Sequence, residues 1–296
     1  MPAEHKFDQA EGLRQLLIRP SLRVLTVIGA RKGLGATSVV VNLAAALARA
    51  DKKVLVLDEN LAHDNVANSL ALKPRLDLLN ALRDEIPVRE ILLNAPNGIK
   101  ILPLARAMQA LPTLNEAERE RLLVSLSAAS MGVDVVLVDA TPEGHSVCAS
   151  LSADESLLLV LNATAGGITE SYTLLKQLSA QNGRMDFDLV VNKARNESEA
   201  RLVFENMARV AQQHMKISLR YLGNIPFDPE IERATQLRRP LLEMSADSIS
   251  AKAFIGLAQQ LMLLPATKKY GSNAMSQLIH RLLKQEPVQS ILHAVR

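Results

Sequence analysis

The sequence predicts a doubly wound α/β domain, in which a mostly parallel sheet is flanked by helices on both faces. Short apolar runs occur without polar alternation, which is typical of strands that are covered on both sides. Stretches of helical length separate these runs, and this order favours parallel strand pairing through right-handed crossovers. Ligands of such sheets bind at the carboxyl ends of the strands, so a functional site is expected there.

The elements follow in a regular order along the chain. The expected strands are Leu22–Ile28, Val54–Leu57, Ile99–Leu104, Val133–Val138, Ser156–Leu161, Leu189–Val191 and Tyr221–Ile225. The expected helices are Ser38–Ala50, Leu76–Leu92, Glu116–Ser130, Thr169–Gln181, Glu197–Met215 and Ala251–Leu264. We therefore expect one domain over residues 21–264. An extension at residues 1–20 precedes it, and a linker with an amphipathic helix within residues 265–296 follows it.

Composition excludes several classes of function. The chain has 296 residues, 48% of them hydrophobic, which is enough for a large core. Basic and acidic residues nearly balance at 34 and 31, and tryptophan is absent, so no specific nucleic-acid partner is expected. The single Cys148 cannot form an internal disulfide. Without a signal-peptide pattern or an apolar run of about 20 residues, we expect a cytoplasmic protein.

A glycine-rich turn joins the first expected strand to the first expected helix. Its residues are Gly29, Ala30, Arg31, Lys32, Gly33, Leu34, Gly35, Ala36, Thr37 and Ser38. Free main-chain N–H groups and the positive end of the helix make such a turn a phosphate site. Gly33 and Gly35 allow a close approach of the backbone, and the Thr37 hydroxyl is placed to ligate Mg²⁺. The alternative is a glycine turn that holds no ligand.

The turn departs from the P-loop pattern at two positions. Ala30 stands at the first glycine, and Ala36 stands at the lysine that binds the β- and γ-phosphates. A charge-assisted hydrogen bond is worth about 1.5–3 kcal/mol, so its loss weakens binding by about one to two orders of magnitude. The loss for phosphoryl transfer is larger, because charge stabilisation supplies most of that catalysis. Arg31 and Lys32 remain as candidates to replace the missing charge.

On these residues the chain resembles the MinD/ParA group of deviant Walker ATPases, and within it the FlhG/FleN regulators of flagellar number. The group's loop reads K-G-G-x-G-K-T and precedes N-L-A, as Arg31–Thr37 here precedes Asn42–Ala44. The resemblance covers about residues 8–264 and implies a P-loop NTPase fold of the MinD/SIMIBI type. It also implies ATP or ADP as ligand, Mg²⁺ held by Thr37 and Asp139, and an ATP-dependent homodimer.

The same resemblance places further nucleotide residues and one more substitution. The family's second strand ends in D-x-D, where this sequence has Asp58 and, two residues later, Asn60. Asn60 stands at the aspartate that orients the attacking water, and an amide cannot accept a proton as a carboxylate does. Asn192 resembles the asparagine that reads adenine, and Pro226 and Asp228 belong to a segment like the one that closes over the base. The resemblance therefore implies nucleotide binding with weak or absent hydrolysis.

The N-terminal extension matches the family motif D-Q-A-x-x-L-R at every specified position. These positions are Asp8, Gln9, Ala10, Leu13 and Arg14. The resemblance implies that this segment binds the flagellar GTPase FlhF and stimulates its hydrolysis. A short amphipathic helix can dock by its leucines while amide and guanidinium groups reach a phosphate site. The alternative is a helix that only covers the first strand.

The expected C-terminal helix, Ala274–Lys284, has a short apolar face without aromatic residues. It either packs on the core or lies peripherally on the inner face of the cytoplasmic membrane or cell pole, as C-termini of this family do in ATP-bound dimers. Its apolar face alone gives only marginal affinity for lipid.

Three hypotheses of function follow from these features. The favoured one is a pseudo-ATPase adaptor that regulates flagellar number and placement by binding an FlhF-like GTPase and flagellar regulator or switch components. The second is an ATP-driven dimerising membrane switch of the MinD type. The third is a ParA-like partition ATPase, for which no basic patch is evident. The two absent hydrolytic charges, at Ala36 and Asn60, favour the adaptor.

Overall fold

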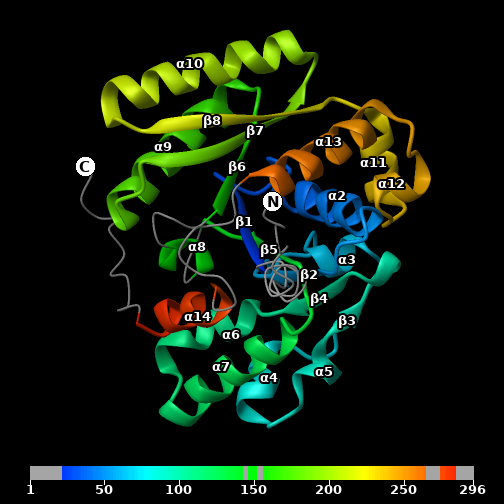
Figure 1. Ribbon diagram of the computed structural model, residues 1–296, viewed down its shortest axis with the longest axis vertical. Coiled ribbons are helices and arrows are strands. Elements are labelled where there is room, and N and C mark those ends of the chain that lie inside the picture. Colours follow the sequence, from blue (N-terminus) through cyan, green and yellow to red (C-terminus); the bar gives the residue numbers. More distant parts are fainter. Residues whose placement is uncertain (1–21, 143–145, 152–155, 265–273, 285–296) are drawn as a thin grey trace, which may run out of the picture.

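In the computed structural model of the protein, residues 22–142, 146–151, 156–264 and 274–284 are described. Within them, eight strands form one sheet in the order β3-β4-β2-β5-β1-β6-β7-β8. All neighbouring strands pair in parallel except β3 and β4, which are antiparallel. Helices flank this sheet along its whole width (Figure 1), and the predicted doubly wound α/β fold is confirmed.

The strands lie within a few residues of the predicted runs. Their bounds are β1 (Arg23–Gly29), β2 (Val54–Asp58), β3 (Leu93–Asn94), β4 (Lys100–Pro103), β5 (Val135–Ala140), β6 (Ser156–Asn162), β7 (Asp186–Ala194) and β8 (Ser218–Pro226). Strand β3 was not predicted, because two residues are too short to leave a pattern of hydrophobic side chains. It closes one edge of the sheet by pairing with β4.

The helices are more numerous than the sequence indicates. They are α2 (Ala36–Arg49), α3 (Val66–Ser69), α4 (Leu78–Arg83), α5 (Val88–Ile91), α6 (Ala105–Ala110), α7 (Glu116–Ala129), α8 (Val147–Ser150), α9 (Ala165–Asn182), α10 (Glu197–Met215), α11 (Pro229–Gln236), α12 (Leu241–Met244), α13 (Ile249–Leu263) and α14 (Ala274–Lys284). The single helix predicted over Leu76–Leu92 was wrong, since α4 and α5 replace it. Glu85 has a φ of +56° and Pro87 precedes the first residue of α5, so no continuous helix can pass.

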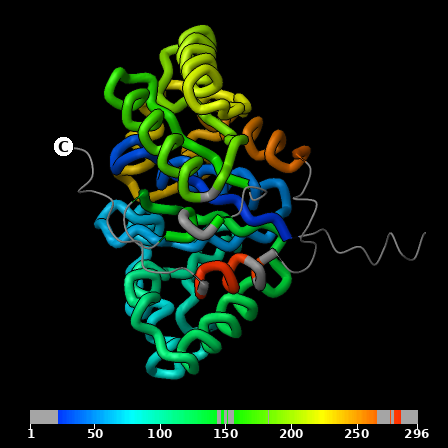
Figure 2. The backbone as a smooth tube through the Cα atoms, turned by 90° about the vertical axis from the view of Figure 1, so that its left-hand side faces the viewer, coloured from blue at the N-terminus to red at the C-terminus, as the bar shows by residue number. Residues whose placement is uncertain are grey.

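Helices on the two faces of the sheet produce two hydrophobic cores. Leu25 and Val27 of β1 belong to the core that α2 and α13 complete. Ile28 belongs to the opposite core, which contains residues of α4, α7, α9, α10 and α14. Because successive side chains of a strand point to opposite faces, a strand between two cores is apolar throughout. The layers are visible edge-on in Figure 2.

The C-terminal helix α14 packs on the body of the protein. Met275, Leu278, Ile279 and Leu282 are at most 3% exposed and belong to the core that α7 and α8 share. Figure 2 shows α14, in red, beside α7. Of the two alternatives for this helix, the structure therefore has the packed one. None of the helices that the structure describes is long and apolar enough to cross a membrane.

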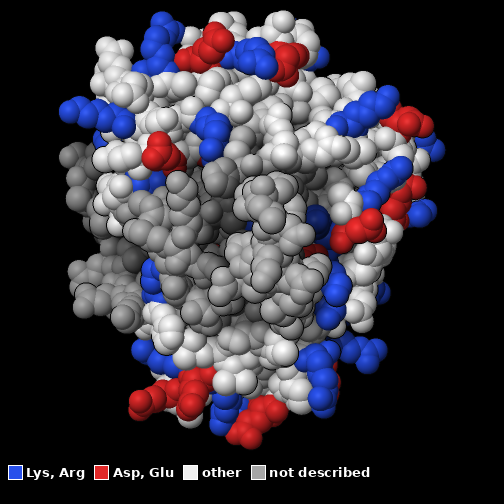
Figure 3. Space-filling model, viewed as in Figure 1, with Lys and Arg blue, Asp and Glu red and all other residues white. Residues whose placement is uncertain are grey.

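The N-terminal motif Asp8–Arg14 lies outside the described residues, and so do residues 285–296 after α14. The partner role of this motif stays a prediction. On the face shown in Figure 3, basic and acidic side chains are interspersed around the rim.

Candidate nucleotide-binding site

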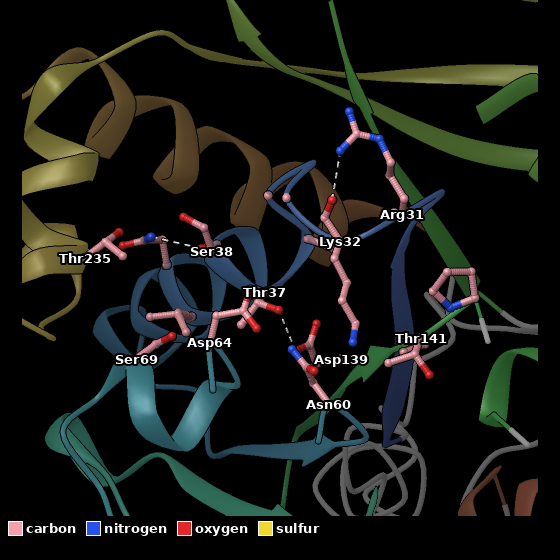
Figure 4. A pocket seen from close by; sticks show the side chains of 18 of the residues that line it. Arg31, Lys32, Thr37, Ser38, Asn60, Asp64, Ser69, Asp139, Thr141 and Thr235 are labelled. Atoms are coloured by element: carbon pink, nitrogen blue, oxygen red, sulfur yellow. Dashed lines mark hydrogen bonds between the residues drawn. The ribbon is translucent and has the colours of Figure 1, made fainter. Parts of the chain in front are cut away.

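A cavity lies at the carboxyl ends of β1, β2 and β5, where the fold class predicts a ligand site. Its walls are the loop after β1, the first turn of α2, the segments that follow β2 and β5, and part of α11 (Figure 4). The predicted site residues that line it are Arg31, Lys32, Gly33, Gly35, Ala36, Thr37, Ser38, Asn60 and Asp139. Leu34 is only 1% exposed and anchors the loop in the protein interior instead.

The loop after β1 has the backbone of an anion site. Gly35 is the N-cap of α2 with a φ of +99°, and no side chain caps this helix. The first N–H groups of α2 therefore have no side-chain acceptor and lie beside the cavity, where the helix dipole favours an anion. Gly33 has a φ of +85°, another conformation that favours glycine.

Asn192, at the end of β7, supports this loop from behind. Its side-chain Nδ2 donates a hydrogen bond to the carbonyl oxygen of Leu34 at 2.9 Å. A Cβ atom on Gly35 would lie 2.2 Å from the same Nδ2, which is far inside van der Waals contact. The glycine at this position is thus required by packing as well as by its dihedral angles.

Thr37 and Asp139, predicted from different parts of the chain, meet in the cavity. The Thr37 hydroxyl donates to Asp139 Oδ2 at 2.8 Å, and strand register puts Asp58 opposite Asp139 on the neighbouring strand. Hydroxyl and carboxylate oxygens are the ligands that Mg²⁺ prefers, together with water and phosphate oxygens. The residues therefore fit a magnesium–phosphate group: Thr37 and Asp139 would hold the metal, and the N–H groups of α2 would hold the phosphate. The metal would supply neutralisation of the phosphate charge.

Burial perturbs the carboxyl groups at the ends of β2 and β5. It raises the pKa of Asp58 to about 6 and that of Glu59 to about 7. Burial, and then the charge of Asp58, raises the pKa of Asp139 well above its usual value. The N–H groups of Asn60 and Ala67 partly offset the effect at Asp58, to which they donate. This wall of the cavity thus holds negative charge at a substantial energetic penalty.

The segment after β2 is held by local hydrogen bonds. The side-chain oxygen of Asn60 accepts from the N–H of Ala62 at 2.9 Å. The carboxylate of Glu59 accepts from the Ser146 hydroxyl at 2.6 Å and from the Val147 N–H at 2.7 Å. Glu59 therefore connects the end of β2 to the start of α8. Its position in the sequence, between the two motif residues Asp58 and Asn60, did not indicate this link.

The structure does not bring the predicted base-binding residues into the described lining of the cavity. Asp228 caps α11 by accepting from Glu230 N at 3.0 Å, and it also accepts from Ser250 N at 3.2 Å. The Ser250 hydroxyl donates to the Pro226 carbonyl oxygen at 3.1 Å. These contacts, like that of Asn192 with the loop, hold the fold together around the site. Contact of the three residues with adenine stays a prediction.

Sequence reasoning missed three residues that line the cavity from late in the chain. They are Ala234 and Thr235 of α11, and Arg239. Asn42 of α2 accepts a hydrogen bond from Leu241 N at 2.8 Å, which holds this region against α2. The signal that could have pointed to Arg239 is the basic pair that it forms with Arg238 in the sequence.

Comparisons with known proteins agree with this geometry. Residues 25–241 match the CobQ/CobB/MinD/ParA nucleotide-binding domain family. The antiactivator FleN of Pseudomonas aeruginosa is 32% identical over 84% of this chain and 89% of its own. The flagellum site-determining protein YlxH of Helicobacter pylori is 22% identical over 88% of this chain and 90% of its own. The septum site-determining protein MinD of Pyrococcus horikoshii, solved with Mg-ADP, has the same fold, with a TM-score of 0.59 at 22% identity over 82% of this chain and 97% of its own.

The family match covers most of the domain. The fold, the cavity and the Thr37–Asp139 hydrogen bond agree with this match, and the structure shows them without it. The chain belongs to the MinD/ParA family of nucleotide-binding domains and is related within it to the antiactivator FleN.

Proposed function

We propose that this chain regulates flagellar number and placement as an adaptor that binds nucleotide and hydrolyses it slowly or not at all. The observation that carries the proposal is the similarity, over more than four-fifths of the chain, to the antiactivator FleN and to the flagellum site-determining protein YlxH. Loss of the protein should change the number or position of flagella on the cell, counted by electron microscopy. An unchanged flagellar pattern would contradict the flagellar role.

The proposal of slow hydrolysis rests on the side chains around the Thr37–Asp139 pair. Ala36 lines the cavity where the P-loop has its lysine, so that charge is absent from the start of α2. Asn60 lines the same cavity with an amide that already accepts from Ala62 N. An amide cannot take the proton of an attacking water, and charge stabilisation is the main source of rate in phosphoryl transfer.

Titration calorimetry with Mg-ATP, run alongside a phosphate-release assay, tests this point. Measurable binding with phosphate release near the background rate is the expected result. A family member that has the P-loop lysine, assayed under the same conditions, is the reference. Turnover comparable to that reference would refute the pseudo-ATPase part of the proposal.

We propose further that the N-terminal motif binds an FlhF-like GTPase and stimulates its hydrolysis. The sequence supports this through the motif residues Gln9 and Arg14, whose amide and guanidinium groups suit a phosphate site. Deletion of residues 1–20 and the variant Gln9→Ala should both remove the stimulation. Glu11→Ala, at an unspecified position of the same motif, is the matched control and should retain it. Full stimulation by the deletion variant would remove the partner assignment.

A further inference from the structure

Three basic side chains line the described part of the cavity, and two of them are committed to acidic partners. Arg31 Nε lies 2.6 Å from Glu170 Oε2 of α9, and Arg239 NH2 lies 3.4 Å from Glu243 Oε2 of α12. The third is Lys32, which forms no ion pair with any residue that the structure describes. Among the described residues, Lys32 is thus the lining cation that is not held by a carboxylate.

The side chain of Lys32 extends into the cavity, whereas that of Arg31 turns away from it. Figure 4 shows the Lys32 ammonium group directed past Thr37 toward Asp139 and Thr141. The Arg31 guanidinium lies on the outer side of the loop, where it meets Glu170. Two neighbouring cations therefore point in opposite directions.

Contacts within the loop fix this division. Arg31 NH1 donates a hydrogen bond to the carbonyl oxygen of Lys32 at 3.1 Å, while its Nε is held by Glu170. The next residue, Gly33, has a φ of +85° and allows the chain to turn back toward α2. Arg31 thus acts as a positioning residue for the peptide that carries Lys32.

The place that Lys32 reaches is the place where the phosphate chain of a nucleotide would need positive charge. Thr37 and Asp139 would hold the magnesium ion, which would supply neutralisation of charge on the phosphate chain. The P-loop lysine acts on the β- and γ-phosphates, and at its position the chain has Ala36. A lysine ammonium is a point charge with three donors on a flexible stem, so it can serve the same oxygens from another position in the loop.

We propose that Lys32 supplies the contact to the terminal phosphates of a bound nucleotide that Ala36 cannot make. The inference rests on the proposed function, since it assigns a residue to the nucleotide site described there. It concerns binding: the ammonium replaces a missing phosphate contact, and Asn60 still lacks the carboxylate that hydrolysis needs. The site then selects nucleotides with a β- and γ-phosphate over a monophosphate.

The test uses Lys32→Met in the full chain, because methionine keeps an unbranched side chain and removes the charge. We expect the dissociation constant for Mg-ATP, measured by calorimetry, to rise about 10- to 100-fold. Affinity for AMP should stay unchanged. Lys176→Met, which removes an exposed cation of α9 outside the lining of the cavity, is the matched control and should leave Mg-ATP affinity unchanged. Adding Ala36→Lys to Lys32→Met should restore most of the affinity.

Each outcome bears on the inference. Binding of Mg-ATP by Lys32→Met as tight as by the wild-type chain would overturn the assignment of Lys32 and leave the proposed function standing. Wild-type protein that binds neither Mg-ATP nor Mg-ADP would overturn this inference together with the nucleotide part of the proposed function. The melting temperature of the variant without nucleotide distinguishes a structural role of Lys32 from a role in phosphate binding. If Lys32→Met lowers it and Ala36→Lys does not restore affinity, Lys32 neutralises the buried carboxylates instead, and the inference fails.

Discussion

The two walls of the cavity differ in which features of a nucleotide site they retain. The loop wall, between β1 and α2, keeps its backbone form, with left-handed glycines and an uncapped helix start, but carries alanine where a lysine is expected. The strand wall, at the ends of β2 and β5, keeps buried carboxyl groups with raised pKa values. The main-chain part of a nucleotide site can therefore be retained when part of its charge is lost. The first is maintained by packing, whereas the second depends on single side chains.

The loop wall should be the more fragile of the two to a change in backbone. Gly35→Ala places a Cβ atom 2.2 Å from Asn192 Nδ2 at a φ of +99°. We expect the free energy of unfolding, measured by urea denaturation, to fall by about 2–5 kcal/mol from strain and overpacking together.

Gly132→Ala is the matched control, because Gly132 also has a positive φ of +71° but a Cβ atom there meets nothing within 4 Å. It should lose only the strain part, about 1–3 kcal/mol. In a double-mutant cycle, Asn192→Ala should relieve part of the loss caused by Gly35→Ala. Strictly additive effects would contradict the proposed clash.

The strand wall should show its charge through pH. The pKa of Glu59 is raised from 4.5 to about 7, so the folded protein holds this proton more tightly than the unfolded chain does. The resulting stability is fully present below about pH 4.5 and is lost as pH rises through about 7. Because each pKa unit is worth about 1.4 kcal/mol, the loss is on the order of 3 kcal/mol.

Glu59→Gln should remove that part of the pH dependence, because glutamine does not ionise. The difference in unfolding free energy between wild type and variant should therefore shift in favour of the variant between pH 4.5 and 8. Asp58 and Asp139 remain in both proteins, so the difference isolates Glu59. A difference that stays constant with pH would show that the pKa of Glu59 is the same in the folded and unfolded chain.

Restoring the lysine at position 36 and the carboxylate at position 60 should separate the contributions of the two walls to binding and hydrolysis. Ala36→Lys adds a second cation to the loop wall beside Lys32, so it should tighten Mg-ATP binding by less than the roughly 10- to 100-fold that Lys32→Met loses. Asn60→Asp adds a carboxylate, and the two changes together should raise phosphate release above that of either single variant. No gain in the double variant would indicate that further groups are missing.

The smallest effect is expected at the outer side of the loop. The Arg31 and Glu170 side chains are 53% and 38% exposed, and exposed ion pairs contribute about 0.2–1 kcal/mol. Glu170→Ala should therefore lower the free energy of unfolding by less than about 1 kcal/mol. It also frees Arg31, so nucleotide affinity should change only a few-fold. A large loss of affinity would show that Arg31 positions the loop more strongly than its exposure indicates.

The sheet was readable from sequence because its strands are apolar on both faces. The runs Val54–Leu57 and Ser156–Leu161 appear in the structure nearly as predicted. Short elements were not readable: β3 has two residues, and α3, α5, α8 and α12 have four each, too few for a periodic pattern. The break between α4 and α5 depends on the backbone at Glu85, although Pro87 offered a signal.

The candidate site was readable where residues are close in sequence or follow a strand. Thr37 and Asp139 were predicted as partners and lie 2.8 Å apart. The direction of Lys32 could not be read, because it depends on Arg31 being held by Glu170 of a helix far along the chain. Arg239 lines the cavity near the start of α12, which a hydrogen bond from Leu241 N to Asn42 joins to α2, and such a contact between distant segments leaves no sequence pattern.

The contact between Asn192 and the loop changes what a glycine at position 35 indicates about function. A glycine letter in a nucleotide motif is usually taken as a trace of nucleotide use. Here the amide of Asn192 fills the space beside Gly35, so a larger residue at 35 has to displace that amide and its hydrogen bond to Leu34. The glycine at position 35 would therefore be retained in a related protein that no longer binds nucleotide. Its presence is evidence for the fold of the loop and not for nucleotide binding.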